Sequence, residues 1–396
     1  MTDVPQAISG DAVAAARQSS RADVLPVVLM LALYTPLLFL GYGSDNDTYL
    51  VLDSGRELIE QRTYTPSRNP GYFLFESIVG VLSRVGGSLL CNAATLAAAV
   101  AALACFLRVC RELDVPRRHL LGLLFVLHPV VWVNSTCTMD YMWALALLLA
   151  GLLMTIRRAY LAAGVALGLA IAVRSTSFVG VGLVLAFPFA GRREDRPRVL
   201  AAGLIAVALG GLFYLPSFRH AGYTPAFLRP MTGGAEFWTP KLRLARFVYK
   251  NLYFWGLVGS MMLPVLLFLG RRPLSDPRRR GAVLACAAVV GAYEALFLKY
   301  PIELAYLLPV VPAVLILLGI ALAERPGALA ALAAALMLYA AVNFNVARPD
   351  NPERATGGTV GLWVEPGLVV QDARERAALR HCDTFSCWQR VTGREY

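Results

Sequence analysis

Two aspartates, Asp45 and Asp47, are the residues of this chain whose type and spacing most readily suggest chemistry. They lie in a polar stretch between Gly41 and Tyr72 that interrupts an otherwise apolar sequence and that also contains Arg68. Paired carboxylates can take a proton from a hydroxyl group or bind a divalent cation. A nearby arginine can bind phosphate through two hydrogen bonds. A D-x-D triplet is also common in solvated loops, so its meaning depends on its place in the chain.

Further ionisable residues stand at the ends of apolar segments. Asp140 opens one such segment, Arg174 lies at a turn between two others, and Lys299 and Glu303 flank a third turn. Charge inside a bilayer is costly, so such residues usually pair with one another or contact a substrate. Each of them alone could instead cap a helix or extend into the lipid headgroups. Their arrival at one face favours a functional cavity.

The composition indicates a polytopic membrane protein. Of the 396 residues, 57% are hydrophobic and only 16% are charged, which excludes an ordinary soluble domain. The formal net charge of +11 is carried by short basic clusters between apolar runs. Membrane topology and anionic headgroups account for such clusters, so we expect membrane lipids, and no nucleic acid, as partners.

The apolar runs predict an all-α membrane protein. A crossing takes about 20 apolar residues, and by this measure residues 24–345 form a transmembrane domain of about eleven helices. His128 precedes Pro129 in the predicted range 119–135, and it is expected to be a core residue with satisfied hydrogen bonds. We place the crossings at residues 24–42, 88–107, 119–135, 139–156, 160–173, 176–190, 199–216, 249–270, 281–298, 304–323 and 327–345.

The arginine clusters orient these crossings. Arginine-rich connections normally stay in the cytoplasm, which places there residues 1–23 and the connections near residues 108–118, 157–158, 192–198 and 271–280. An even number of crossings must separate any two clusters. This leaves no crossing for residues 72–82, which are expected to form a surface helix. The acidic loop 43–87, the loop 217–248 and the tail 346–396 are then external.

These segments resemble the GT-C superfamily of polyprenyl-phosphate-sugar-dependent glycosyltransferases, which includes protein O-mannosyltransferases and lipid A aminoarabinose transferases. The resemblance covers residues 24 to about 345. It rests on the acidic triplet after the first span, on Pro66-Ser67-Arg68-Asn69-Pro70-Gly71-Tyr72, on Thr138-Met139-Asp140-Tyr141, and on Glu303-Leu304-Ala305-Tyr306-Leu307-Leu308-Pro309 with Pro312. The last stretch is similar to the family's E-x-RYLLPxxP segment. Ala305 stands where arginine is common, and Lys299 or Arg174 could supply that charge.

The resemblance implies transfer of a hexose or pentose, with inversion, at the external face of a bacterial plasma membrane. Asp45 would deprotonate the hydroxyl of a lipid, glycan or protein acceptor. Asp47 would orient the acceptor or share a divalent cation with Asp45, and no other cofactor is expected. The candidate phosphate ligands are Arg68, Arg174 and Lys299. The other candidate substrate-binding residues are Tyr72, Asp140, Glu303 and Tyr306.

Two other classes of protein would also use lipid-linked sugars. A transporter or flippase needs many spans and a charged cavity, but it is expected to reach both faces of the membrane. A surface-polysaccharide polymerase is expected to carry its dominant polar loop later in the chain. The acidic loop directly after the first span favours the transferase. In the tail, Cys382 and Cys387 could form a local disulfide, and the sequence leaves this open.

Overall fold

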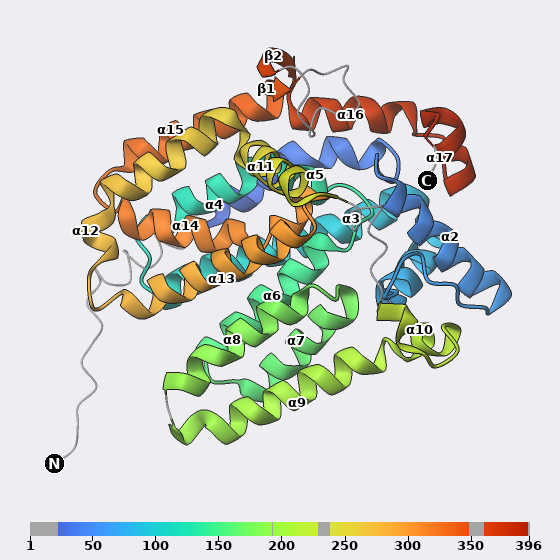
Figure 1. Cartoon of the computed structure of the whole chain (residues 1–396), viewed down its shortest axis with the longest axis horizontal. Coiled ribbons are helices and arrows are strands. Elements are labelled where there is room, and N and C mark those ends of the chain that lie inside the picture. The colour runs from blue at the N-terminus through green and yellow to red at the C-terminus, as the bar shows by residue number, and fades with distance from the viewer. Residues whose placement is uncertain (1–22, 192, 229–237, 348–359, 395–396) are drawn as a thin grey trace.

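The computed structural model describes residues 23–191, 193–228, 238–347 and 360–394 (Figure 1). Predictions made for residues 1–22, 229–237 and 348–359 lie outside these ranges. Most of the described elements are helices, in agreement with the Leu- and Ala-rich segments, since both residues have high helix propensity. The first apolar helix is Asp23–Phe39, and its last turn is the 3-10 helix η1 (Thr35–Phe39).

The remaining elements follow in chain order. They are α2 (Asn46–Gln61), α3 (Phe73–Glu112), α4 (Arg118–Leu127), α5 (Pro129–Asn134), α6 (Tyr141–Ile156), α7 (Tyr160–Val173), α8 (Ser177–Gly191), η2 (Arg193–Asp195), α9 (Arg196–Leu212), α10 (Leu215–His220), η3 (Pro225–Leu228), α11 (Pro240–Leu269), α12 (Arg271–Leu274), α13 (Arg280–Lys299), η5 (Leu304–Leu307), α14 (Val310–Ala321), α15 (Pro326–Ala341), β1 (Val342–Ala347), β2 (Val360–Pro366), α16 (Leu368–Ala378) and α17 (Phe385–Thr392).

The apolar helices differ in length from the predicted spans. Among the described residues, 3 helices (α3, α11 and α13) are long and apolar enough to cross a membrane. The other apolar helices are 10–17 residues long. Each of the predicted ranges contains helical residues, but the predicted range 119–135 is divided between α4 and α5. Pro129 begins α5, because proline lacks the N–H group that would continue α4.

A break in α3 separates the predicted surface helix from the second predicted span. Gly86 and Gly87 have non-helical backbone angles, with a φ of 60° at Gly87. The residues before the break pack closely against α2, where a Cβ atom on Gly80 would lie 2.4 Å from the carbonyl oxygen of Gly55. Two glycines thus let the two backbones touch. The start of the second predicted span at residue 88 agrees with this break.

A β-hairpin was missed by the sequence analysis. Strands β1 and β2 pair in antiparallel fashion, with Val342 opposite Pro366 and Asn345 opposite Trp363. The prediction that the last span continues to residue 345 is therefore wrong, because α15 ends at Ala341. The alternation of apolar and polar residues from Val342 onward has the period of a strand, and Asn343 lies among these alternating residues.

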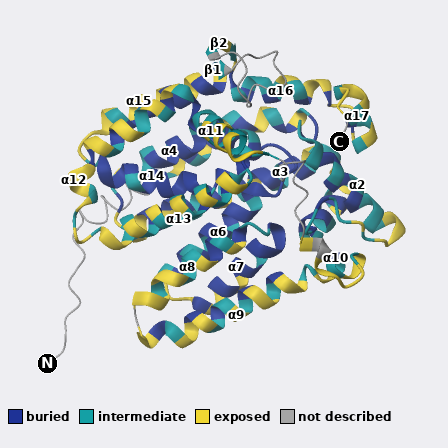
Figure 2. Cartoon of the chain, viewed as in Figure 1, coloured by how far each residue is buried: buried dark blue, intermediate teal, exposed yellow. Residues whose placement is uncertain are grey.

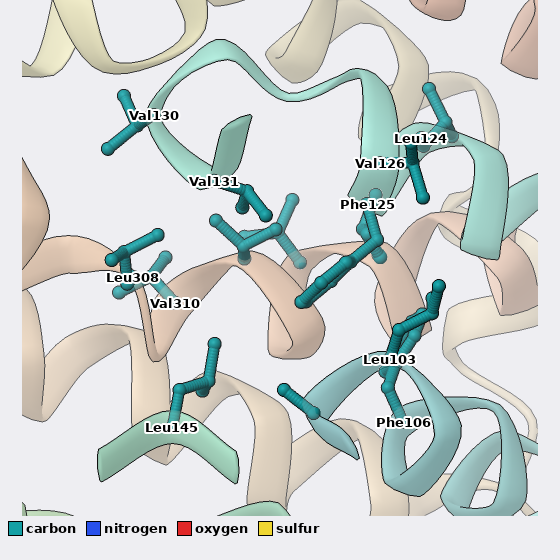
Figure 3. Close-up of a cluster of buried hydrophobic side chains, with 14 of the residues drawn as sticks. Leu103, Phe106, Leu124, Phe125, Val126, Val130, Val131, Leu145, Leu308 and Val310 are labelled. Carbon is teal, nitrogen blue, oxygen red and sulfur yellow. The ribbon is translucent and has the colours of Figure 1, made fainter. Parts of the chain in front are cut away.

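The core is formed by several helices at once. Figure 3 shows Leu103 and Phe106 of α3 near Phe125 of α4, with Leu145 of α6 in the same cluster. The rings of Phe106 and Phe125 stack with their centroids 5.5 Å apart. Leu308 and Val310 lie in the same cluster, so side chains far apart in the sequence share one interior.

Exposed residues lie along the outer sides of the helices (Figure 2), and many of them are large and apolar. Leu204 on α9 is 72% exposed and Met261 on α11 is 66% exposed. Helices that are apolar on the outward side as well as the inward side are typical of a lipid environment. The fold is that of an integral membrane protein.

The arginine-rich connections and the segment that carries the acidic triplet lie at opposite ends of the molecule. In Figure 1, α12 and the connection between α8 and α9 lie at the left, whereas α2, α10 and α17 lie at the right. The left-hand connections carry arginine clusters, and α2 carries the acidic triplet at its start. The side of the membrane on which each end lies stays a prediction.

Candidate active site

A buried cluster of two arginines and two aspartates joins three distant parts of the chain. Asp140, which is 0% exposed, accepts a hydrogen bond of 3.1 Å from Arg68 Nη2 and one of 2.7 Å from Arg174 Nη1. Arg68 Nη1 lies 3.3 Å from Asp47 Oδ2. The formal charges of this arginine–aspartate cluster cancel. Buried charges persist when they are paired in this way.

Tyrosine rings surround the two guanidinium groups. Arg174 lies 3.8 Å from the ring centroid of Tyr141 and 5.1 Å from that of Tyr306. Arg68 lies 4.8 Å from the centroid of Tyr72. Cations over aromatic faces are attracted by the ring quadrupole. The structure therefore brings together Asp47, Arg68, Tyr72, Asp140, Arg174 and Tyr306, all predicted from the sequence to be site residues.

Glu76, a residue that the sequence analysis did not select, organises the loop that carries Arg68. Its fully buried carboxylate accepts hydrogen bonds from the Ser67 amide at 3.0 Å, from the Ser67 hydroxyl, and from the Tyr64 hydroxyl at 2.5 Å. Burial raises the pKa of Glu76, while these donors oppose the rise. A single glutamate within the apolar run after Tyr72 was the signal that could have identified it.

Asp45 lies beside this cluster at the edge of a polar cavity of about 410 Å³. It is the N-cap of α2, and its Oδ1 accepts a hydrogen bond of 2.8 Å from the amide of Asp47. Burial raises the pKa of Asp45 well above its usual value, and the negative charges of Glu303 and Asp47 raise it further. Burial also raises the pKa of Glu303, while the positive charge of Lys250 opposes that rise. The cavity thus holds carboxylates that bind protons more tightly than usual.

Two cations on α11 line the same cavity, and the sequence analysis missed both. Arg246 and Lys250 are one helical turn apart. Residues 240–248 were assigned to an external loop, whereas α11 begins at Pro240. The signal was a repeat of basic residues and tyrosines every three or four positions, which places them on one helix face. Arg246, Tyr249, Lys250 and Tyr253 all line the cavity.

Lys299 lies apart from this site. Its side chain is exposed, and its ammonium nitrogen is 5.3 Å from the ring centroid of Tyr300. It does not line the cavity, whereas Ala305, the position where the family commonly has arginine, does. Arg174, the other candidate for that charge, is paired with Asp140. The cavity receives its positive charge from α11 instead.

The C-terminal tail is anchored in the wall of the site by Arg376. This arginine is 0% exposed and donates hydrogen bonds to the carbonyl oxygens of Thr136 at 2.7 Å, Leu37 at 2.9 Å and Gly41 at 3.1 Å. These carbonyl groups belong to segments that precede the tail by more than two hundred residues. Arg376 therefore fixes the end of the first span to the connection before α6.

Other tail residues hold the chain next to Asp45. Asp372 accepts a hydrogen bond of 2.7 Å from the Ser44 hydroxyl, and the Trp388 indole donates one of 3.1 Å to the Ser44 carbonyl oxygen. Cys382 and Cys387 form a disulfide, which the sequence had left open. The tail packs on the acidic loop, as a segment too short for its own core must.

The structure turns Asp47 toward Arg68 rather than toward Asp45. Within the described part of the chain, the one group of three potential ligand side chains is His381, Cys382 and Cys387. It lies in the tail, and its two sulfur atoms are joined to each other. A divalent cation held by Asp45 and Asp47 stays a prediction.

The buried histidine differs from its expected state. The ring of His128 lies against Phe254 and Trp255, with centroid distances of 4.8 and 4.6 Å. Neither ring nitrogen has a hydrogen-bond partner among the described residues. The expectation of satisfied hydrogen bonds is therefore wrong for the structure as described.

The fold and this site together define a helical membrane protein with a buried charged cluster beside a polar cavity. No protein-family model matches the sequence, and no curated protein sequence matches it. Among solved structures, the chain is similar to the crystal structure of ArnT from Cupriavidus metallidurans bound to undecaprenyl phosphate. The TM-score is 0.57 at 17% identity, over 76% of this chain and 60% of that one.

The same ArnT in the apo state gives a TM-score of 0.56 at 15% identity, over 78% of this chain and 60% of that one. The chain thus spans about 60% of the length of these structures. At this identity the likeness establishes the fold. It confirms the predicted all-α membrane fold.

Proposed function

We propose that the chain is a membrane glycosyltransferase that moves a sugar from a polyprenyl-phosphate donor to an acceptor hydroxyl at the external face, with inversion. One observation carries the proposal. The carboxylate of Asp45 lines the same polar cavity as the cations Arg246 and Lys250. A reaction that removes a proton at one place and releases a phosphate at another needs this combination.

The chemistry follows from these groups. The acceptor oxygen attacks the anomeric carbon and forms the new carbon–oxygen bond, while its proton goes to Asp45. The bond between the anomeric carbon and the phosphate oxygen breaks, and its electron pair leaves with the phosphate. A carboxylate with a raised pKa is a stronger base, and Asp45 has this property. Arg246 and Lys250 bind the phosphate and stabilise its developing charge.

The arginine–aspartate cluster has a positioning role in this proposal. Its charges are balanced within the cluster, and neither Arg68 nor Arg174 lines the polar cavity, whereas Arg246 and Lys250 do. Arg174 lies over Tyr141, and Tyr141 lines the cavity. The cluster therefore fixes one wall of the site. This assignment replaces Arg68, Arg174 and Lys299 as the groups that bind the leaving phosphate.

In this proposal, the prenyl chain of the donor binds in an apolar groove. It has a volume of about 470 Å³ and lies between α6, α8, α13 and α14. Tyr141 lines the polar cavity, and Leu145, one turn further along α6, lines the groove. Ala305 of η5 lines the cavity, and Pro309, at the start of α14, lines the groove. The polar cavity and the apolar groove are therefore neighbours along α6 and along the segment from η5 to α14. Undecaprenyl phosphate bound to ArnT supports a lipid of this class.

The test is Asp45→Asn in the full-length protein reconstituted into liposomes. Undecaprenyl-phosphate sugars labelled in the sugar serve as donors, and membranes from cells that lack the gene supply acceptors. We expect turnover to fall about 100- to 10,000-fold, the usual worth of a general base, while donor binding is retained. Glu60→Gln, an exposed carboxylate on the same helix, is the control and should leave turnover unchanged.

Two outcomes would contradict the proposal. Turnover in Asp45→Asn above a tenth of the wild-type value would remove Asp45 as the base. Movement of intact labelled donor across the bilayer, with no transfer of its sugar, would favour the transporter instead. A surface-polysaccharide polymerase would extend one acceptor repeatedly, which product mass distinguishes from a single addition.

A further inference from the structure

The helix α16 of the tail forms one wall of the polar cavity. Gln371 and Glu375 line the cavity from adjacent turns, and Gln371 Nε2 donates a hydrogen bond of 3.1 Å to Glu375 Oε1. Asp372 lies between them and is held by Ser44 and Arg376. The polar groups that α16 presents to the cavity are therefore an amide and carboxylates.

Thr48 on α2 adds a hydroxyl group to this wall. It is 0% exposed to solvent, lines the cavity, and has no hydrogen-bond partner for Oγ1 among the described residues. A buried hydroxyl without a partner costs free energy, so a ligand that fills the cavity would satisfy it. Thr48 follows Asp45 by three residues, which places it about one helical turn away. A group bound to Thr48 therefore lies beside the proposed base.

Charge is divided between the two sides of the cavity. Arg246 and Lys250 come from α11, whereas Asp372 and Glu375 come from α16. The tyrosines of α11, Tyr249 and Tyr253, line the cavity with their ring centroids 4.9 Å apart. A phosphate is attracted to Arg246 and Lys250 of α11 and repelled by Glu375 of α16, whereas the charge of Asp372 is balanced by Arg376. Sugar hydroxyls, in contrast, can donate to carboxylates and accept from an amide or a hydroxyl.

We propose that Thr48, Gln371 and Glu375 form the acceptor subsite and that the acceptor is an uncharged carbohydrate. This inference rests on the proposed transferase function. Neighbouring hydroxyl groups of the acceptor bind the amide and carboxylate of α16, and Thr48 binds a third hydroxyl next to the one that reacts. The reacting hydroxyl then lies within reach of Asp45. The tail thereby selects the acceptor, while α11 binds the donor.

The test uses the full-length protein in liposomes with labelled undecaprenyl-phosphate sugars as donors. The acceptor probes are methyl glycosides of neutral hexoses and pentoses, a peptide containing serine and threonine, and hexose phosphates. We expect saturable transfer to at least one neutral glycoside. Gln371→Ala, Glu375→Gln and Thr48→Val should each raise the KM for that glycoside, by about tenfold for the charged residue, with a smaller effect on kcat. Arg374→Gln, at an exposed position of the same helix, is the control.

The outcomes separate this inference from the proposed function. Release of sugar from the donor by the wild type, absent in Asp45→Asn, upholds the transferase whatever the acceptor is. With that activity present, three results would overturn the subsite: no transfer to any neutral glycoside, a lower KM for the peptide or a hexose phosphate, or an unchanged KM in all three variants. Absence of donor cleavage by the wild type would overturn the proposed function itself. Thr48→Val and Glu375→Gln conserve shape, and unfolding curves identify any variant that fails to fold.

Discussion

Replacing Asp140 by asparagine removes the one carboxylate that two buried arginines share. The hydrogen bonds to Asp140 measure 3.1 Å from Arg68 and 2.7 Å from Arg174. At an effective dielectric constant of about 20, each pair attracts by roughly 5 to 6 kcal/mol. Desolvation of the charges offsets much of this attraction, and loss of one partner from a buried pair costs about 3 to 5 kcal/mol. We expect Asp140→Asn to lower the free energy of unfolding by that amount.

The assay is denaturant unfolding of the purified protein in detergent micelles. Asp383→Asn is the matched control, because Asp383 forms an exposed ion pair with Arg56 at 2.9 Å and such pairs contribute less than about 1 kcal/mol. Adding Arg174→Met to Asp140→Asn should restore part of the loss, since it removes an unpaired buried charge. If Asp140→Asn costs no more than Asp383→Asn, the cluster does not stabilise the site as described.

Three further predictions concern the cavity and its support. Glu303→Gln removes a negative charge that raises the pKa of Asp45. The deprotonated form of Asp45 then persists to lower pH, so the acid limb of the pH–activity profile should move to lower pH. An unmoved acid limb would argue against this coupling. Lys250→Ala should raise the KM for the donor at least about tenfold. Lys299→Ala, outside the cavity, should leave this KM unchanged. Equal effects of the two substitutions would contradict the assignment of Lys250 as a donor-binding residue. Gly55→Ala places a Cβ atom 2.6 Å from the carbonyl oxygen of Glu76. This substitution should destabilise the packing of α2 on α3 by about 1 to 3 kcal/mol, as measured by thermal unfolding. An unchanged melting temperature would show that the contact relaxes freely.

The sequence predicted the arginine–aspartate cluster better than the cations that line the polar cavity. Asp47, Arg68, Asp140 and Arg174 stand out because charge is rare in or beside apolar segments, and the structure brings all four together. Arg246 was missed because hydropathy marks where a helix becomes apolar rather than where it begins. Helix α11 continues through its polar end to Pro240.

Contacts between distant segments could not be predicted from one sequence. Arg376 belongs to a charged stretch that resembles an ordinary solvated helix, and only its carbonyl partners more than two hundred residues away explain its burial. The strand β1 follows directly on a helix, and its short alternating pattern was too brief to separate it from the preceding apolar run. Local patterns report local structure, whereas these features depend on tertiary pairing.

The anchoring of the first loop by the tail also sets an order of assembly. Ser44 and Asp372 are 328 residues apart in the sequence, and Ser44 and Trp388 are 344 apart. A ribosome therefore makes the segment around Asp45 early, and its hydrogen-bond partners only near the end of synthesis. Contacts of such long separation form late in folding. Asp45, the proposed base, would thus reach its final position only after most of the helices have been made.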